Sequence, residues 1–292
     1  MNSKTFLAIL VVAIIWGTTF LGIKIGVETV PPWFVAGLRQ FTAASILFFI
    51  LLFTKKLKWV GFKNFKIQIV LSSLMLIGGN GLTTVAEQNL SSSLTSLISA
   101  LSPVFIFASS LIVGLEKFTF RSLTGLLLGF SGIIFIFWDG FSDLKNPKYL
   151  FGIAILFLSL LSWSIGAIYA KKIHGQNQNI FLNLFYQFAF AGVAQIFLGF
   201  LFSGNIDIQK WSFQSVSAIL YLAIFGSLIT FYAYYFLLRK LLPTQISILS
   251  YVNTIIAIFL GWLILNEPVS MKFIVATISI IGGVFIMNYR KM

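Results

Sequence analysis

Apolar residues along this chain are gathered into long, nearly uninterrupted runs. Ten runs of roughly 20 mainly apolar residues follow one another, and this is the length at which an α-helix crosses a bilayer. The runs do not alternate apolar and polar positions and are about twice the length of a barrel strand, which excludes a transmembrane β-barrel. The predicted spans are residues 5–27, 33–53, 67–87, 92–114, 121–138, 149–170, 180–202, 214–237, 244–265 and 270–288.

The segments between the predicted spans are short. Ten helices of this length leave roughly 80 of the 292 residues for loops and tails, so we expect no soluble domain and treat 1–292 as a single transmembrane domain. The first run is too long for the apolar core of a signal peptide, and Val27–Pro32 does not supply a small-residue cleavage site. We therefore predict an all-α polytopic membrane protein that keeps its first span.

Charged residues support this class and give an orientation. They make up 9% of the chain, against about 25% in soluble domains. The formal net charge of +13 first suggests a nucleic-acid partner, but 14 of the 20 Lys and Arg residues fall on one side of the predicted membrane and only four on the other. Short loops rich in Lys and Arg are typically cytoplasmic, so we expect both termini inside and no nucleic-acid partner.

The residues needed for several kinds of chemistry are missing from the sequence. There is no Cys and only one His, His174, which excludes disulfides, thiol nucleophiles and metal sites that need two imidazoles. No phosphate-binding loop or dinucleotide motif occurs, and Gly78–Gly81 lies inside an apolar run and is interpreted as a flexible helix segment. Acidic residues are scattered rather than clustered as in a membrane-embedded lipid enzyme. We expect no cofactor, no metal and no enzymatic activity.

The two halves of the chain repeat each other. Residues match at an offset of 147 in the first two spans of each half and at 151 in the later spans. Five helices per half is an odd number, so equivalent helices must cross the bilayer in opposite directions, as in many secondary transporters. Repeat one is placed at about 5–138 and repeat two at about 149–289. The matched pairs are Trp16 with Trp163, Lys24 with Lys171, Gln40 with Gln187, Ser99 with Ser250, Glu116 with Glu267, and Gly132 with Gly283.

Short motifs occur in an order and spacing that together carry a family resemblance. They are Trp16–Phe20 with Lys24, Ala86–Gln88, Ser91–Leu97 with Ser102 and Pro103, and Gly261–Pro268. The sequence resembles the drug/metabolite transporter superfamily, EamA branch, over nearly its whole length. This resemblance implies a ten-helix exporter or exchanger of small metabolites with a central cavity, and we expect it in the bacterial cytoplasmic membrane. The ninth span lacks the proline of the fourth, so we expect the bend at Pro103 to have no counterpart there.

Polar residues inside spans are expected to face protein or water rather than lipid. On the third, fourth and ninth spans they recur on one helical face and form three stripes. Close helix packing through Ser and Thr is the alternative interpretation, but three stripes, two of them related by the repeat, favour a polar cavity. Pro103 is a candidate hinge, with a static kink as the alternative. The residues predicted to contact substrate are Trp16, Arg39, Asn80, Thr84, Ser99, Ser102, Trp163, Ser250, Tyr251 and Asn253.

Arg39 and Glu87 are the ionisable residues that distinguish the halves. A charge at mid-bilayer costs roughly 2.5–3.5 kcal/mol, so neither side chain should face lipid. Lys24 recurs in the second half and is interpreted as structural. In contrast, Arg39 aligns with Tyr186, and Glu87 aligns with Leu238. The two residues form either an ion pair that holds helices together or a switchable site, in which Arg39 binds a substrate anion and Glu87 binds a proton or cation.

These features together predict a secondary transporter that works by alternating access. We expect export of small metabolites, such as amino acids, driven by protons that bind Glu87; an uncoupled facilitator or exchanger, a channel and a lipid scramblase are the alternatives. Glu116 and Glu267 are interpreted as helix caps or loop anchors at the membrane surface. The spacing of Gly125 and Gly129 fits packing within the bundle better than dimerisation, so we expect a monomer or weak homodimer in the lipid bilayer.

Overall fold

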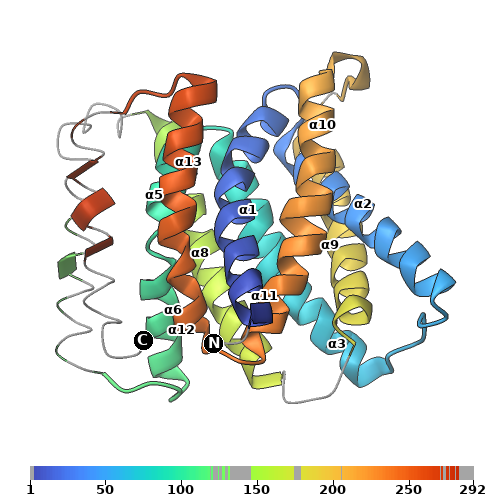
Figure 1. The fold of residues 1–292 in the computed structure, drawn as a ribbon. Coiled ribbons are helices and arrows are strands. Elements are labelled where there is room, and N and C mark those ends of the chain that lie inside the picture. The colour runs from blue at the N-terminus through green and yellow to red at the C-terminus, as the bar shows by residue number, and fades with distance from the viewer. Residues whose placement is uncertain are drawn as a thin grey trace.

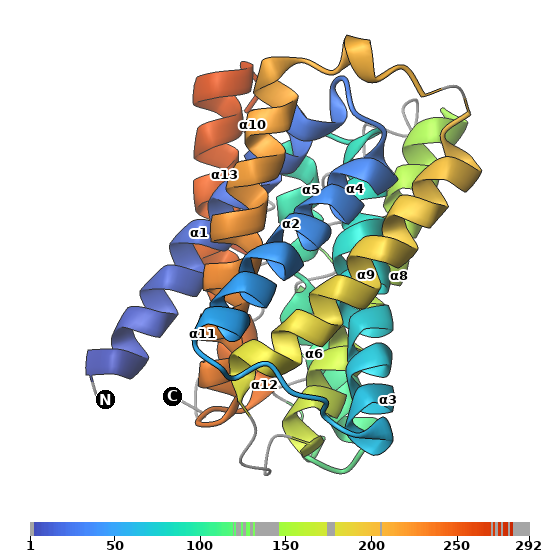
Figure 2. The ribbon, with the colours of Figure 1, turned by 90° about the vertical axis from the view of Figure 1, so that its right-hand side faces the viewer.

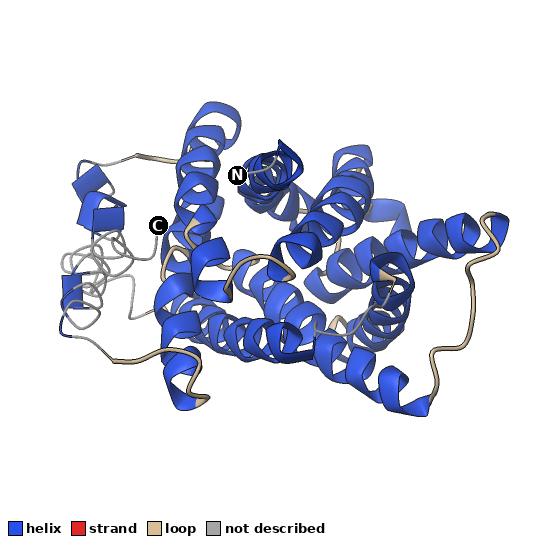
Figure 3. Ribbon diagram, turned by 60° about the horizontal axis from the view of Figure 1, so that its bottom comes forward, coloured by secondary structure: helices blue, strands red, loops and turns tan. Residues whose placement is uncertain are grey.

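The computed structural model describes residues 3–118, 146–173, 179–204 and 206–269, with a few separate residues between 120 and 131 and between 271 and 282. Over these residues the chain is helical and contains no strand (Figure 3). Eight helical segments are long and apolar enough to cross a membrane, and they correspond to eight of the ten predicted spans. The other two, at 121–138 and 270–288, lie largely outside the described residues, as do Gly125 and Gly129.

The first half contributes four of these spans. The first two are single helices, whereas the third and fourth are divided into shorter segments (Figure 1). The first span is α1 (Ser3–Val27) and the second is α2 (Pro32–Phe53). The third consists of α3 (Phe62–Leu71), η1 (Ser72–Gly81) and α4 (Leu82–Glu87). The fourth consists of α5 (Ser92–Ser99) and α6 (Ser102–Ile112).

The second half follows the same plan. Its spans consist of two long helices followed by two divided ones, and a short 3-10 turn, η3, lies in the loop after the second helix. The two long helices are α8 (Pro147–Ile173) and α9 (Ile180–Phe202), and the turn η3 is Ile208–Lys210. The next span consists of α10 (Phe213–Tyr221), η4 (Leu222–Ile229) and α11 (Thr230–Leu238). The last consists of α12 (Pro243–Ser247) and α13 (Leu249–Leu265).

Local capping chemistry fixes where several helices begin. Ser91 Oγ accepts a hydrogen bond from Leu94 N (3.2 Å), and Ser212 Oγ accepts one from Ser215 N (3.1 Å). Each bond satisfies a backbone donor that has no partner within its own helix. Proline occupies the first turn of α2 and of α12, where its missing N–H removes no helical bond. The span boundaries therefore follow from capping as well as from hydropathy.

The third and eighth spans each contain a π-helical segment at the same place in the repeat. The segment η1 begins at Ser72 and η4 begins at Leu222, one residue from the offset of 151 that relates these parts of the sequence. π-Helical winding replaces the regular i→i+4 hydrogen bonds and is frequent at functional sites. Gly78–Gly81, interpreted from the sequence as a flexible helix segment, falls at the end of η1.

Both the fourth and the ninth spans are interrupted. Pro103 lies in the first turn of α6, directly after the break between α5 and α6. The ninth span is interrupted at Ile248, although this residue keeps helical backbone angles. Ser247 Oγ donates to Thr244 O (2.9 Å) just before this residue. At the offset of 151, Ile248 corresponds to Leu97 inside α5, whereas the break before Pro103 corresponds to residues inside α13. The absence of a counterpart to the bend at Pro103 therefore stays a prediction.

The helices α1 and α8 occupy equivalent places in the repeat and run in opposite directions (Figures 1 and 2). Near the end of α1, Lys24 Nζ donates to Glu87 O at the end of α4 (2.9 Å). Near the start of α8, Gly152 packs against Leu90, just beyond the same end of α4. The end of α1 and the start of α8 therefore lie on one side of the bundle, which is the relation that an inverted repeat requires.

The helices α2 and α9 approach each other closely at glycines. A Cβ atom on Gly37 would lie 2.7 Å from Ile196 N, and one on Gly192 would lie 2.7 Å from Phe41 N. Both distances are too short for a carbon contact, so these positions accept only hydrogen. Small residues that let backbones approach are a common basis of helix packing in membranes, where lipid tails are as apolar as the side chains.

We expect Gly192→Val to destabilise the protein. The new side chain must push α2 away from α9, and overpacking costs roughly 1–3 kcal/mol. The melting temperature of the purified protein should fall by about 4 °C or more. Val193→Ile is the matched control, because the Val193 side chain is 60% exposed on the same helix. Equal melting temperatures for the two variants would contradict the close contact.

Candidate functional site

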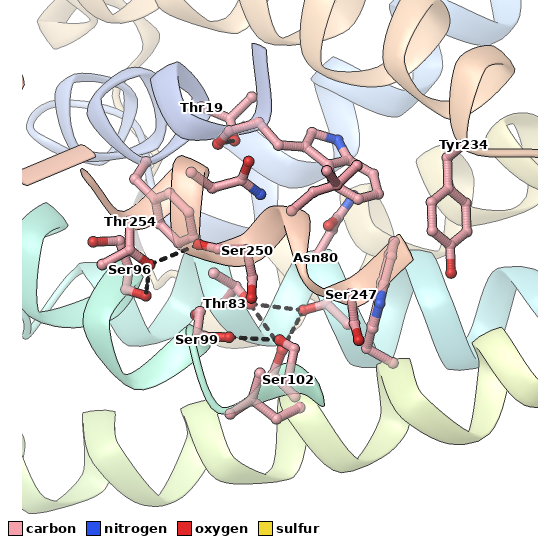
Figure 4. A pocket seen from close by; sticks show the side chains of 18 of the residues that line it. Thr19, Asn80, Thr83, Ser96, Ser99, Ser102, Tyr234, Ser247, Ser250 and Thr254 are labelled. Carbon is pink, nitrogen blue, oxygen red and sulfur yellow. Dashed lines mark hydrogen bonds between the residues drawn. The ribbon is translucent and has the colours of Figure 1, made fainter. Parts of the chain in front are cut away.

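A polar cavity of about 130 Å³ lies between the two halves of the repeat (Figure 4). Its wall is formed by the first four spans of one half and by the first, third and fourth spans of the other. Transporters built from inverted repeats bind their substrates at this kind of interface. The cavity is therefore the candidate functional site.

Eight of the ten residues predicted to contact substrate line this cavity. They are Trp16, Arg39, Asn80, Ser99, Ser102, Trp163, Ser250 and Asn253. The other two do not line it. Thr84 is buried and donates to Asn80 O (2.8 Å), while Tyr251 is packed within an apolar cluster. Helical periodicity identifies a polar face but not the neighbour that this face meets. A role in substrate binding stays a prediction for all ten.

Some cavity residues were overlooked in the sequence. Thr83 and Ser159 share a hydrogen bond of 2.8 Å, and both line the cavity together with Tyr234. Thr83 lies one position away from the predicted stripe through Thr84, and Ser159 resembles any other hydroxyl residue in an apolar helix. The available signal for Tyr234 was a phenol inside the last turns of a span, since a buried phenol needs a polar neighbour.

Aromatic rings from both halves give the cavity an apolar wall. The repeat-equivalent Trp16 and Trp163 meet edge to face, with ring centroids 5.3 Å apart and an interplanar angle of 80°. The ring of Tyr234 lies 5.2 Å from Trp16 and 5.5 Å from Trp163, and Phe231 packs against the same pair. Edge-to-face contacts stabilise such clusters beyond the burial of area alone.

Three polar groups on the cavity wall have no hydrogen-bond partner in the described part of the protein. They are Asn80 Nδ2, Tyr234 OH and Ser250 Oγ. Other hydroxyls nearby are satisfied internally; Ser102 Oγ, for example, donates to Ser99 O (2.6 Å; Figure 4). Because buried polar groups are nearly always hydrogen-bonded, the three groups are available to a ligand in the cavity.

Arg39 is buried, lines the cavity, and is held by the second half rather than by an acid. Its Nε donates to Ser227 Oγ (2.7 Å) and its Nη2 donates to Gly226 O (3.1 Å). Both acceptors belong to η4, so a first-half arginine is oriented by the π-helical segment of the other half. No ion pair joins Arg39 to Glu87, both of which the structure describes. The ion-pair interpretation was wrong, because Arg39 is turned toward η4 of the other half while the Glu87 carboxyl group has no hydrogen-bond partner.

Glu87 is fully buried outside the cavity lining. Both of its carboxyl oxygens lack a hydrogen-bond partner, although its main-chain oxygen accepts the bond from Lys24 Nζ. A buried carboxyl group without partners is rare, because its ionised form is costly in an apolar environment. The role of Glu87 in proton binding stays a prediction.

The repeated lysine makes the same contact in both halves. Lys24 Nζ also donates to Leu90 O (2.7 Å), just beyond α4, and Lys171 Nζ donates to Leu238 O (2.7 Å) at the end of α11. Leu238 is the repeat equivalent of Glu87. A cation at a helix C-terminus satisfies carbonyls that lack helical partners, which agrees with the structural role predicted for this lysine.

Two glutamates link the halves through a second repeated contact. Glu267 Oε1 accepts from Ser92 N (2.8 Å) and Ser92 Oγ (2.9 Å). Its Oε2 accepts from Ser93 N (2.9 Å) and Ser93 Oγ. In the equivalent place, Glu116 Oε1 accepts from Thr244 Oγ1 (2.6 Å). The predicted caps are therefore caps across the interface: each half's glutamate contacts the helix start of the other half, where anions are stabilised.

Both halves of the chain match a model of the EamA-like transporter family, at residues 3–138 and 150–289. The uncharacterized transporter YoaV of Bacillus subtilis is 28% identical over 98% of this chain and 97% of the relative. The uncharacterized inner membrane transporter YedA of Escherichia coli K12 is 31% identical over 88% of this chain and 81% of the relative. A solved crystal structure has the same fold, with a TM-score of 0.72 over 99% of each chain at 17% identity.

Proposed function

Because the chain belongs to the EamA-like transporter family, we propose that it is a secondary transporter that exports small metabolites, such as amino acids or related organic compounds, by alternating access. The observation that supports this function is the polar cavity between two inverted halves, with unpartnered polar groups on its wall. The proposed setting is the bacterial cytoplasmic membrane, with both termini inside.

Alternating access requires closures at both ends of the cavity that open in turn. Two contacts are candidates for these closures. The Glu267 contact joins Glu267 to Ser92 and Ser93, and the Glu116 contact joins Glu116 to Thr244. The first follows the end of α4 and the second follows the end of α11. These ends lie at opposite ends of α1, because Lys24 reaches Leu90 while Lys240 donates to Thr5 Oγ1 (3.2 Å).

Proton coupling is the proposed energy source, with Glu87 as the residue that carries the proton. Its carboxyl group is fully buried and unpartnered, and it lies just before the loop that leads to Ser92 and Ser93. A change in its charge would therefore act beside the Glu267 contact. The positive-inside pattern places this end of the bundle on the outer side.

Spin labels at both ends of the bundle test alternating access. The chain contains no Cys, so cysteine pairs can be introduced without removing native ones. The exposed residues Gln88 and Val269 form a pair near the Glu267 contact, and the exposed Lys117 and Leu242 form a pair near the Glu116 contact. A change from neutral to acidic pH in nanodiscs should lengthen one distance distribution and shorten the other, as measured by electron–electron double resonance. Unchanged distances, or two that lengthen together as in an open pore, would reject this mechanism.

A further inference from the structure

We infer that the cavity selects a small organic anion, whose carboxylate or similar group binds Arg39 and whose apolar portion packs on the aromatic wall of Trp16, Trp163 and Tyr234. This inference rests on the proposed transport function and names its substrate class. It also assigns Ser227 as the residue that positions Arg39 for this contact.

The guanidinium of Arg39 keeps both its charge and a donor group for a ligand. Its two protein acceptors, Ser227 Oγ and Gly226 O, are neutral, so neither balances the positive charge. Nη1 has no partner among the described residues, and the side chain lines the cavity. Arginines in spans pair with one another, with acids or with backbone carbonyls; Arg39 uses one carbonyl and one hydroxyl. A carboxylate fits the remaining edge of the planar guanidinium with charge-assisted hydrogen bonds.

The other residues of the cavity wall also favour a negatively charged ligand. Asn80 Nδ2 is a donor without a partner, and the hydroxyls of Tyr234 and Ser250 can donate as well. None of the described residues that line the cavity is Asp or Glu. An ammonium group would therefore find no carboxylate there and would be repelled by Arg39. The expected order of affinity is anion first, then neutral compound, then cation.

Ser227 acts through Arg39 rather than by contact with the ligand. It is fully buried in η4 and is absent from the cavity lining. The neighbouring Gly226 carbonyl also accepts from Trp16 Nε1 (3.4 Å), so one π-helical segment fixes both the arginine and part of the aromatic wall. In the other half, Tyr186 stands in place of Arg39 and Leu76 in place of Ser227. The anion site is therefore single and asymmetric.

A matched series of four compounds tests the class: 3-phenylpropionate as anion, 3-phenylpropionamide as neutral isostere, L-phenylalanine as zwitterion and 3-phenylpropylamine as cation. Binding to the full chain in nanodiscs is measured by calorimetry. The wild type should bind the anion at least about tenfold more tightly than the amide, which corresponds to one charge-assisted contact. Arg39→Gln should remove this difference, and continued binding of the amide shows that the variant is folded.

Two further variants distinguish the orientation of the Arg39 guanidinium from the overall positive charge of the protein. Ser227→Ala should weaken anion binding by about three- to tenfold and leave amide binding unchanged, because it removes a hydrogen bond that orients the guanidinium. Lys210→Gln is the control, since it removes an exposed positive charge paired with Asp207 at 3.2 Å outside the cavity, and it should change neither affinity. Equal affinity for anion and amide, an anion preference that persists in Arg39→Gln, or binding of none of the four compounds would overturn the inference.

The spin-label experiment distinguishes failure of this inference from failure of the proposed function. If the two distances respond in opposite directions but the wild type shows no preference for the anion, transport by alternating access stands and the substrate class is wrong. If the distances do not respond at all, the proposed function fails, whatever the four compounds bind.

Discussion

Glu87→Gln is expected to abolish accumulation driven by a pH gradient while leaving substrate exchange intact. The Glu87 carboxyl group is fully buried at the end of α4 without a hydrogen-bond partner, so no hydrogen bond offsets the loss of hydration of its ionised form. Gln has nearly the same shape and cannot gain or lose a proton. The charged side chains whose fields reach this group are those of Lys24, Glu267 and Arg39, and none of them hydrogen-bonds it.

Uptake of radiolabelled 3-phenylpropionate and of radiolabelled amino acids into proteoliposomes measures both activities, with unlabelled compound preloaded in the vesicles for counterflow. Accumulation under a pH gradient should fall at least about tenfold in the variant, whereas counterflow without a gradient should stay within about twofold of the wild type. Glu28→Gln is the control, because it replaces the same carboxyl group at a solvent-exposed position in the loop after α1. Full pH-driven accumulation in Glu87→Gln would remove the proton-carrying role from this residue. A wild type that exchanges but never accumulates would be an uncoupled exchanger.

Glu267→Ala is expected to shift the transporter toward the conformation that is open at the predicted outer side. The carboxylate accepts four hydrogen bonds from Ser92 and Ser93 in the other half, and hydrogen bonds to charged groups contribute roughly 1.5–3 kcal/mol each. The bonds are replaced in part by water when the closure opens. A net change of about 2 kcal/mol would alter the equilibrium roughly thirtyfold.

The spin-labelled pairs described above measure this shift directly. In Glu267→Ala the distance between Gln88 and Val269 should become longer and that between Lys117 and Leu242 shorter. Glu116→Ala, at the repeat-equivalent position, should produce the opposite change. A shift in the same direction for both variants would mean that the glutamates stabilise the fold and not alternate closures.

Gly261 provides an independent test of the same contact. A Cβ atom at this position would lie 2.5 Å from Glu267 Oε2 and 2.6 Å from Ser93 Oγ, so Gly261→Ala displaces the carboxylate without removing it. We expect the same outward shift as in Glu267→Ala, with a smaller amplitude. The spin-label distances of the two variants can be compared directly.

Several local features of the fold were predictable because single residues or short segments determine them. Eight apolar runs became helical spans because bilayer thickness fixes the length of a spanning helix and backbone groups must be satisfied within it. The break near Pro103 follows from the missing N–H of proline. The interruption at Ile248 was not predictable in the same way, because no proline marks it and the residue keeps helical backbone angles.

The candidate site was predictable only as far as one helix specifies it. Periodicity placed Asn80 and Ser250 on polar faces, and both line the cavity. The same reasoning placed Thr84 beside them, although the neighbouring Thr83 is the residue that reaches the cavity. Tyr234 was missed because it lies in a cluster with Tyr232 and Tyr235, and such a cluster does not show which of the rings faces the cavity.

The sequence by itself determined the class of protein, its family, the repeat and the scarcity of charge that singles out Arg39 and Glu87. Only the tertiary structure decided which partners these residues meet: Arg39 binds Ser227 and Gly226, and Glu87 contacts none through its carboxyl group. The physical reason is that composition and periodicity describe one helix at a time. The rotation and depth of a helix against its neighbours depend on close contacts, such as those at Gly37 and Gly192, that form only when the whole bundle packs.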